Sequence, residues 1–179
     1  MSSETPARPD APKPEPIILT LAMEDRAWER FQTLRQRHFP QTLNRVPAHV
    51  TLFHALPDDE AKVRAVVEKA CAERAPFDVE VTELRSLGRG VAYRCHSDEL
   101  SVVRDEIAST FSDRLTKQDA QGFRAHVTVQ NKVTPETAKQ TLEALSRDFE
   151  PWSFRALGID IWHYAGGPWR PIGRVEFCA

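Results

Sequence analysis

Cysteines, long apolar runs and an excess of basic residues are scarce or missing in this chain of 179 residues. The three cysteines lie far apart without a C-x-x-C pair, which argues against both a disulfide framework and a zinc ribbon. The best apolar run, Ile17 to Met23, contains Thr20 and is far shorter than the roughly 18 residues that a membrane span requires. The N-terminus lacks the apolar core of a signal peptide. We therefore expect a cytoplasmic protein with reduced thiols and no membrane partner.

Charge is nearly balanced, with 24 Lys and Arg residues against 26 Asp and Glu residues and a formal net charge of -2. A protein that holds long duplex nucleic acid through its phosphates needs a basic face, so this composition predicts no binding of that kind. A small phosphorylated ligand needs only a few local cations and is compatible with the composition. We expect a monomer.

Proline is concentrated at the N-terminus, where residues 1–16 hold five of the 13 prolines, interleaved with charged residues and without an aromatic one. Such a segment buries too little apolar surface to offset the entropy that ordering would cost, so a disordered tail is predicted. Residues 17–179 are predicted to form a single domain.

Hydrophobic periodicity within that domain predicts interspersed strands and helices. The expected strands cover residues 17–22, 48–53, 77–84, 91–95 and 125–130, followed by a hairpin of 152–164 and 169–177. The expected helices cover residues 25–37, a segment after 57–59, residues 98–114, and a segment from 134–136 to about 149. Several strands follow one another without a helix between them, which favours an α+β fold with antiparallel sheet over a doubly wound parallel sheet.

A short repeat carries the candidate chemistry. Ala48-His49-Val50-Thr51-Leu52 recurs 77 residues later as Ala125-His126-Val127-Thr128-Val129, in a second strand-like run. Side chains two apart on a strand share a face, so each copy presents an imidazole beside a hydroxyl. Two such strands facing each other would place both pairs around one cleft. One imidazole would accept a proton from a nucleophile and the other would protonate a leaving oxygen, with the hydroxyls on a phosphate.

The motifs and their neighbours each allow two interpretations. A single His-x-Thr on a strand is usually a structural pair, whereas two copies in matching context favour function. Phe53 shares the face of the first histidine by alternation, and it either stacks on a base or packs in the core. Arg124 and Lys132, close to the second motif, either bind phosphate or are solvated charges. Tyr93 and Trp162 are candidates for lining the groove on strand placement alone.

A metal site is not predicted. His49 and His54 are five apart on one strand and are expected to face opposite ways, and the other histidines lie in separate segments. The sequence contains no H-E-x-x-H or similar ligand spacing. No metal and no cofactor are expected.

The paired H-x-T-hydrophobic motifs resemble those of the 2H phosphoesterase superfamily, in particular its bacterial 2′-5′ RNA ligase-like branch. The resemblance extends from Ile17 to Phe177 and includes the closing Gly-Gly-Pro-Trp hairpin. It implies a bilobal α+β fold with pseudo-two-fold symmetry, in which two antiparallel-sheet lobes carry helices outside and enclose an active-site groove between them.

The same resemblance implies metal-independent chemistry on 2′,3′-cyclic phosphates or 2′-5′ phosphodiester links, with a small nucleotide or an RNA 3′ end as the substrate. It gives His49 the role of proton donor and His126 that of proton acceptor, and it places Thr51 and Thr128 on the phosphate. The family often carries a basic residue just past the second motif, where Lys132 lies. Two rivals stay open: a non-catalytic nucleotide-binding module, and a scaffold with buried His-Thr pairs.

Overall fold

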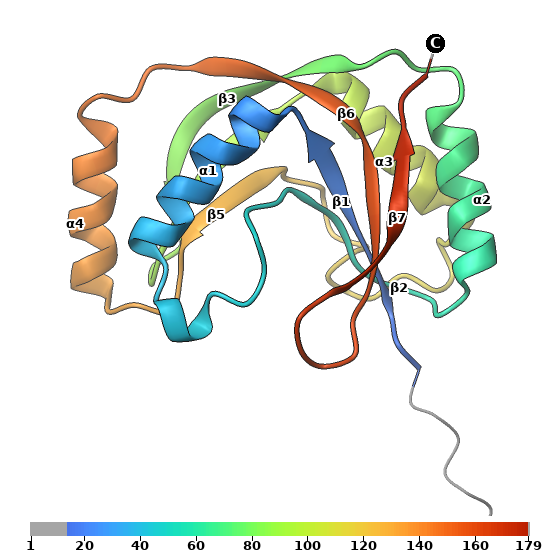
Figure 1. The fold of residues 1–179 in the computed structure, drawn as a ribbon, viewed down its shortest axis with the longest axis horizontal. Coiled ribbons are helices and arrows are strands. Elements are labelled where there is room, and N and C mark those ends of the chain that lie inside the picture. The colour runs from blue at the N-terminus through green and yellow to red at the C-terminus, as the bar shows by residue number, and fades with distance from the viewer. Residues whose placement is uncertain (1–13, 179) are drawn as a thin grey trace, which may run out of the picture.

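The computed structural model describes residues 14–178 of the chain, which form a seven-stranded antiparallel sheet and four α-helices (Figure 1). The strands are β1 (Ile17–Met23), β2 (Thr51–Leu56), β3 (Phe77–Ser86), β4 (Val91–His96), β5 (His126–Gln130), β6 (Trp152–His163) and β7 (Arg170–Glu176). The helices are α1 (Asp25–His38), α2 (Glu60–Cys71), α3 (Asp98–Thr110) and α4 (Pro135–Ser146), with a short 3-10 turn at Gln41–Leu43. The predicted α+β class with antiparallel sheet is confirmed.

Most of the predicted tail, residues 1–13, lies outside the described residues. Its last residues contact the domain. The backbone N–H of Glu15 donates to a carboxylate oxygen of Asp58 (3.0 Å), and the carbonyl of Pro16 accepts from the backbone N–H of Tyr164 (3.0 Å). Residues 15 and 16 therefore contact the segments that follow β2 and β6 before β1 begins.

Three helices begin at capping residues that the sequence contains. The side chain of Asp59 accepts from the backbone N–H of Lys62 at the start of α2, and Ser97 does the same for Leu100 in α3. In α4, Thr134 is the N-cap and Pro135 the first helical residue. These contacts satisfy backbone donors that a helix start would otherwise leave unpaired.

The strands lie in the order β2-β1-β6-β3-β4-β5, with β7 paired to β6. The long strand β6 joins the two lobes, because residues 152–156 pair with β3 and residues 156–163 pair with β1. One lobe therefore contains β2, β1, β7 and the second part of β6. The other lobe contains β3, β4, β5 and the first part of β6. The predicted bilobal arrangement is confirmed, with the two lobes as halves of one curved sheet.

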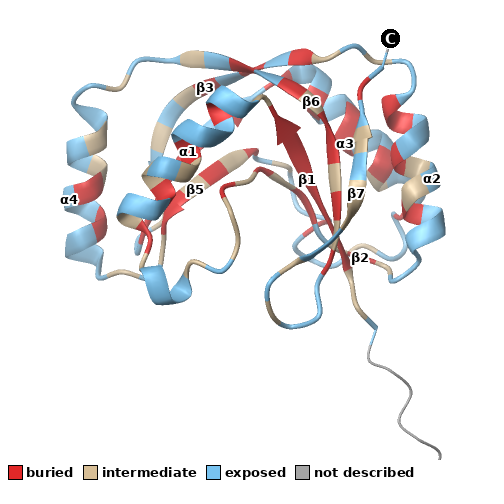
Figure 2. Cartoon of the chain, in the orientation of Figure 1, coloured by how far each residue is buried: buried red, intermediate tan, exposed pale blue. Residues whose placement is uncertain are grey.

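Helices cover the outer faces of the two lobes in pairs, with α2 and α3 on one and α1 and α4 on the other (Figure 1). The chain crosses between lobes to achieve this, since α1 follows β1 but packs on β5. Figure 2 shows that the buried residues lie on the helix sides that face the sheet and along all of β1. Among the described residues, no helix is long and apolar enough to cross a membrane.

The two motif strands stand at opposite ends of the strand order, yet they meet. Val50, just before β2, forms an antiparallel bridge with Val127 in β5, and its carbonyl accepts from the backbone N–H of Leu21 (2.9 Å). This contact requires the sheet to curl until its edges touch. The curl brings the two copies of the repeat together.

Candidate active-site groove

The bridge fixes how the four motif side chains face one another. Neighbours of an antiparallel bridge pair in reverse order, which places His49 opposite Thr128 and Thr51 opposite His126. Val50 and Val127 are fully buried, so the two histidines and two threonines, one residue to either side, lie on the other face. Each histidine therefore faces the threonine of the other motif, and the two histidines lie diagonally across the site.

The two imidazole rings are held in the same way. Nδ1 of His49 lies 2.7 Å from the carbonyl oxygen of Pro47, and Nδ1 of His126 lies 2.8 Å from that of Arg124. A carbonyl oxygen only accepts, so each Nδ1 carries the proton and donates. Nε2 of each ring is then the atom that remains to take up or release a proton. The same i to i−2 contact in both copies gives the repeat a structural meaning that its sequence alone does not carry.

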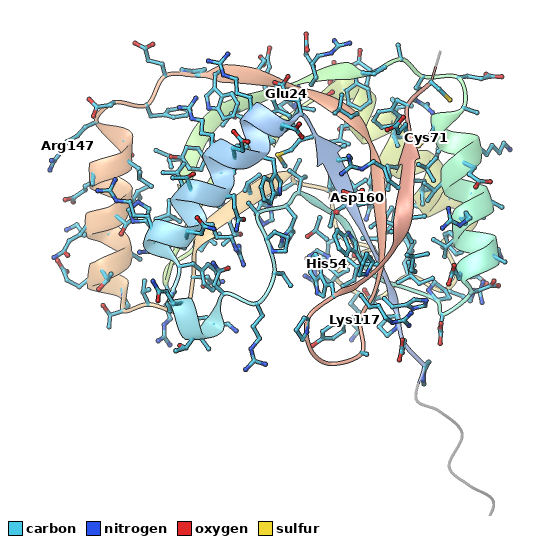
Figure 3. The ribbon with its side chains drawn as sticks, viewed as in Figure 1. Glu24, His54, Cys71, Lys117, Arg147 and Asp160 are labelled. Atoms are coloured by element: carbon cyan, nitrogen blue, oxygen red, sulfur yellow. The ribbon has the colours of Figure 1, made fainter. Side chains whose placement is uncertain are left out.

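A polar row runs from the first motif across its lobe. The register pairs Thr51 with Thr20, Thr20 with Asp160, and Asp160 with Arg174, so these four side chains share one face of four adjacent strands. Arg174 donates twice to the Asp160 carboxylate, at 2.6 and 3.1 Å. Asp160 is labelled in Figure 3, in the central part of the molecule between α1 and α2.

Aromatic residues adjoin His49 on this face. The ring of Trp169 lies 4.6 Å from that of His49 between centroids, and Trp162 lies 6.1 Å from Trp169. Nε1 of Trp162 donates to Oγ1 of Thr20 (2.9 Å). These side chains enclose a pocket of about 270 Å³. Its lining comprises Thr20, Leu21, Met23, Asp25, Trp28, Pro47, Ala48, His49, Asp160, Trp162, Trp169 and Arg174.

Arg35 connects the second motif to the segment just before the first motif through hydrogen bonds, and sequence reasoning missed it. From α1 its Nε donates to the side-chain oxygen of Asn44 (2.8 Å) and the carbonyl of Val46 (3.1 Å), and its Nη1 donates to the carbonyl of Thr128 (2.7 Å). The side chain is buried, and desolvation lowers its pKa to about 10. The one signal in the sequence is spacing: Arg35 follows Ala27 and Phe31 at four-residue intervals on the buried side of α1.

The protonation of His49 follows from its surroundings. Although its surface is partly accessible, protein encloses the ring on most sides, and this desolvation lowers the pKa of His49 to about 4. The hydrogen bond to Pro47 acts in the opposite direction, and the nearby positive charge of Arg35 adds to the lowering. At neutral pH, His49 is therefore neutral in the empty groove, with a lone pair on Nε2.

Simple alternation along β2 fails because the strand contains a bulge. Leu19 pairs with Phe53, but the next residue, Thr20, pairs with Thr51, so residues 52 and 53 both turn toward the core. Phe53 is fully buried, with the guanidinium of Arg104 4.6 Å above its ring. Of the two interpretations of Phe53, core packing is therefore the one that the structure supports, and the side chain does not line the groove.

The same bulge corrects the expectation for His54. It restores His54 to the face of Thr51, whereas simple alternation predicts that His49 and His54 face opposite ways. A positive charge on His54 also contributes to lowering the pKa of His49, which requires the two rings to lie in the same region. Alternation placed His54 on the wrong face because a bulge leaves no clear mark in a sequence.

The remaining candidates lie in different places. Lys132 is exposed in the turn after β5, with a φ of 63°, and it is four residues beyond Thr128 along the strand. Contact of Lys132 with a substrate phosphate therefore stays a prediction. Arg124 is exposed directly before the second motif and orients His126 through its carbonyl. Trp162 lines the pocket beside His49, whereas Tyr93 is buried in the core against Phe31.

Metal ligation finds no support within residues 14–178, where the structure contains no group of three or more His, Cys, Asp or Glu side chains arranged to hold an ion. The groove offers two imidazoles and two hydroxyls. These groups can exchange protons and bind an anion.

The antiparallel bilobal sheet and this groove define a family. Residues 23–168 match the family model of the 2'-5' RNA ligase superfamily, and the chain belongs to it. The search of curated proteins found no match.

Solved structures support the fold. E. coli LigT complexed with 3'-AMP matches 93% of this chain and 100% of its own length, at a TM-score of 0.63 and 14% identity. TT0787 of Thermus thermophilus matches 90% of this chain and 97% of its own, at a TM-score of 0.63 and 11% identity. E. coli LigT complexed with NADP+ matches 92% and 99%, at a TM-score of 0.59 and 14% identity.

Proposed function

We propose that this protein is a metal-independent phosphodiesterase that acts on 2′,3′-cyclic phosphates or 2′-5′ phosphodiester links of nucleotides and RNA ends. The observation that carries the proposal is the matched pair of imidazoles, each oriented by a carbonyl two residues earlier and each opposite a threonine of the other motif. Membership of the 2'-5' RNA ligase superfamily agrees with it. So does the 3'-AMP bound by E. coli LigT, a structural neighbour.

The proposed reaction on a cyclic phosphate needs one proton acceptor and one proton donor. Water attacks phosphorus while its proton passes to Nε2 of His49. The bond from phosphorus to one ring oxygen breaks, and that oxygen takes the proton from Nε2 of His126. Thr51 and Thr128 donate to the non-bridging oxygens, which carry the developing charge. The product is a nucleoside monophosphate, and the two imidazoles have exchanged protonation states.

His49 is given the acceptor role because its pKa of about 4 leaves it neutral in the empty groove. The family resemblance gives the two histidines the reverse roles. The orientation of the rings is compatible with either, since both leave Nε2 free. Protonation before substrate binding therefore decides our assignment.

The pH dependence of kcat/KM tests this assignment, because kcat/KM reports on groups of the free enzyme. An acceptor must be neutral, so we expect activity to fall as the pH drops through about 4, well below the ordinary histidine pKa of about 6.5. The measurement is initial hydrolysis of 2′,3′-cyclic AMP between pH 3.5 and 9, over the range where circular dichroism shows the fold intact. An acid limb near 6.5, or activity that rises toward pH 4, would reverse the roles.

Phosphorus NMR of 2′,3′-cyclic AMP with the purified protein in excess EDTA tests the function itself. We expect conversion to one monophosphate by the native protein and none by the His49→Ala/His126→Ala double variant. Turnover that EDTA abolishes would indicate metal chemistry instead. Binding of 3′-AMP without turnover of any cyclic or 2′-5′ linked substrate would favour the non-catalytic module.

A further inference from the structure

His54 is held in place by a buried carboxylate from a distant part of the chain. Nδ1 of His54 lies 3.0 Å from Oδ1 of Asp119, in the loop between α3 and β5. The same carboxylate accepts from the backbone N–H groups of His54 (2.8 Å) and Ala55 (2.9 Å). Burial alone would raise the pKa of the Asp119 carboxyl, but these hydrogen bonds outweigh it and hold the pKa below its ordinary value. Asp119 is therefore a buried carboxylate anion beneath the imidazole.

The anchoring loop is itself fixed. Arg104, from α3, donates to the carbonyl of Asp119, and the backbone N–H of Asp119 donates to Oγ1 of Thr116 (3.2 Å). Asp119 is only 2% exposed, so its side chain has little freedom to move. The loop that leads into the second motif thus orients a side chain of the first motif's strand.

The imidazole of His54 has a solvent-exposed end. The side chain of His54 is 44% exposed, and its recorded hydrogen bond within residues 14–178 is the one from Nδ1 to Asp119. Nε2 therefore points away from the carboxylate and is available to a ligand. Stabilising the bulge does not require this ring, because Asp119 already satisfies the two backbone N–H groups that β2 leaves at its edge.

Position along β2 indicates what His54 would contact. His54 is three residues past Thr51 on the same face, so the two lie several ångströms further apart than one phosphate group can bridge. The phosphate that reacts lies at Thr51 and the histidine pair in the proposed function. An imidazole N–H donates to a phosphate oxygen, and the Asp119 carboxylate behind the ring of His54 fixes its orientation. The separation suits the next phosphate of the same nucleotide or oligonucleotide.

We propose that His54, oriented by Asp119, is a specificity-determining residue that binds a second phosphate of the substrate beside the one that reacts. The proposal rests on the proposed function, since the reacting phosphate sets the substrate's position. It makes the preferred substrates nucleotides with a further phosphate, such as 5′-phosphorylated ends or oligonucleotides, over nucleosides with a single cyclic phosphate.

Titration calorimetry at pH 6 with two unreactive probes, 3′-AMP and adenosine 3′,5′-bisphosphate, tests the proposal. We expect the native protein to bind the bisphosphate about 10-fold more tightly, as for one added charge-assisted hydrogen bond. The ratio should approach one in His54→Gln. This variant retains the backbone contacts to Asp119 and is expected to fold. His96→Gln is the matched control, because His96 is also exposed beside a carboxylate, that of Asp98 (3.5 Å), and should keep the native ratio.

The outcomes separate this inference from the proposed function. Equal affinity of the native protein for both probes, or a native ratio in His54→Gln, overturns the role of His54 alone. Failure of the native protein to bind either nucleotide overturns both. Loss of the ratio in His54→Gln but not in His96→Gln supports the second phosphate site.

Discussion

His126→Ala is expected to lower the turnover of 2′,3′-cyclic AMP by about 10²–10⁴-fold, and His49→Ala by a similar factor. Each substitution removes one of the two groups that must handle a proton, and no other imidazole is oriented in the same way by a carbonyl two residues earlier within the described residues. The double variant should lose little more than either single one, since the two residues act as a unit. Steady-state kinetics of the three variants provide the measurement.

Folding of these variants needs a separate check. The rings lie at the groove surface and the neighbouring Val50 and Val127 form the buried bridge, so we expect circular dichroism and thermal midpoints close to native. His96→Ala, at an exposed site outside the groove, should keep native turnover. Native turnover in either His49→Ala or His126→Ala would remove the two-histidine mechanism.

Arg35→Met is expected to lower kcat by about 10–10²-fold and the free energy of unfolding by about 2–4 kcal/mol. The substitution leaves the carbonyls of Val46 and Thr128 without their donor, in a buried region between the two motifs. The segment that carries Pro47 and His49 would then lose its fixed distance from β5. Because the displacement affects orientation rather than substrate contact, KM should change less than kcat.

The charge of Arg35 supplies a readout that a purely structural residue would not move. Removing a cation near His49 raises the pKa of that imidazole toward its ordinary value, so the acid limb of kcat/KM should shift to higher pH in Arg35→Met. Arg35→Lys keeps a positive charge but lacks the guanidinium that donates to three acceptors. We therefore expect this variant to restore the pH of the acid limb more fully than it restores kcat. Arg30→Met is the matched control on the same helix, where the guanidinium lies over Trp152. Native kcat in a destabilised Arg35→Met protein would limit Arg35 to stability.

Local patterns predicted the elements well. The helix behind Thr134 and Pro135 begins where its N-cap and first-turn proline place it, and the closing hairpin forms β6 and β7. These features depend on residues close in sequence, whose conformational preferences are fixed by short-range sterics and capping. The family resemblance supplied the bilobal fold, which periodicity alone does not contain.

Alternation failed at residues 52 and 53, where the register between β1 and the first motif's strand shifts. Phe53 was assigned to the groove face as one interpretation and His54 to the opposite one, and the bulge in β2 reverses both. A bulge adds one residue between paired positions, so the side chains that follow it change face until the second register shift, between Leu19 and Ile17. The buried Asp119, 65 residues away, is what satisfies the bulged edge.

The sequence by itself determined the helices and strands and the repeated His-x-Thr pair, because both depend on residues only a few positions apart. Only the tertiary structure decided that the two copies meet, since their strands are the two edges of the sheet and touch only through its curl at Val50 and Val127. It also placed Arg35 between the motifs, because α1 crosses to the other lobe before it packs. Long-range contacts of this kind depend on the path of the whole chain, which short sequence patterns do not encode.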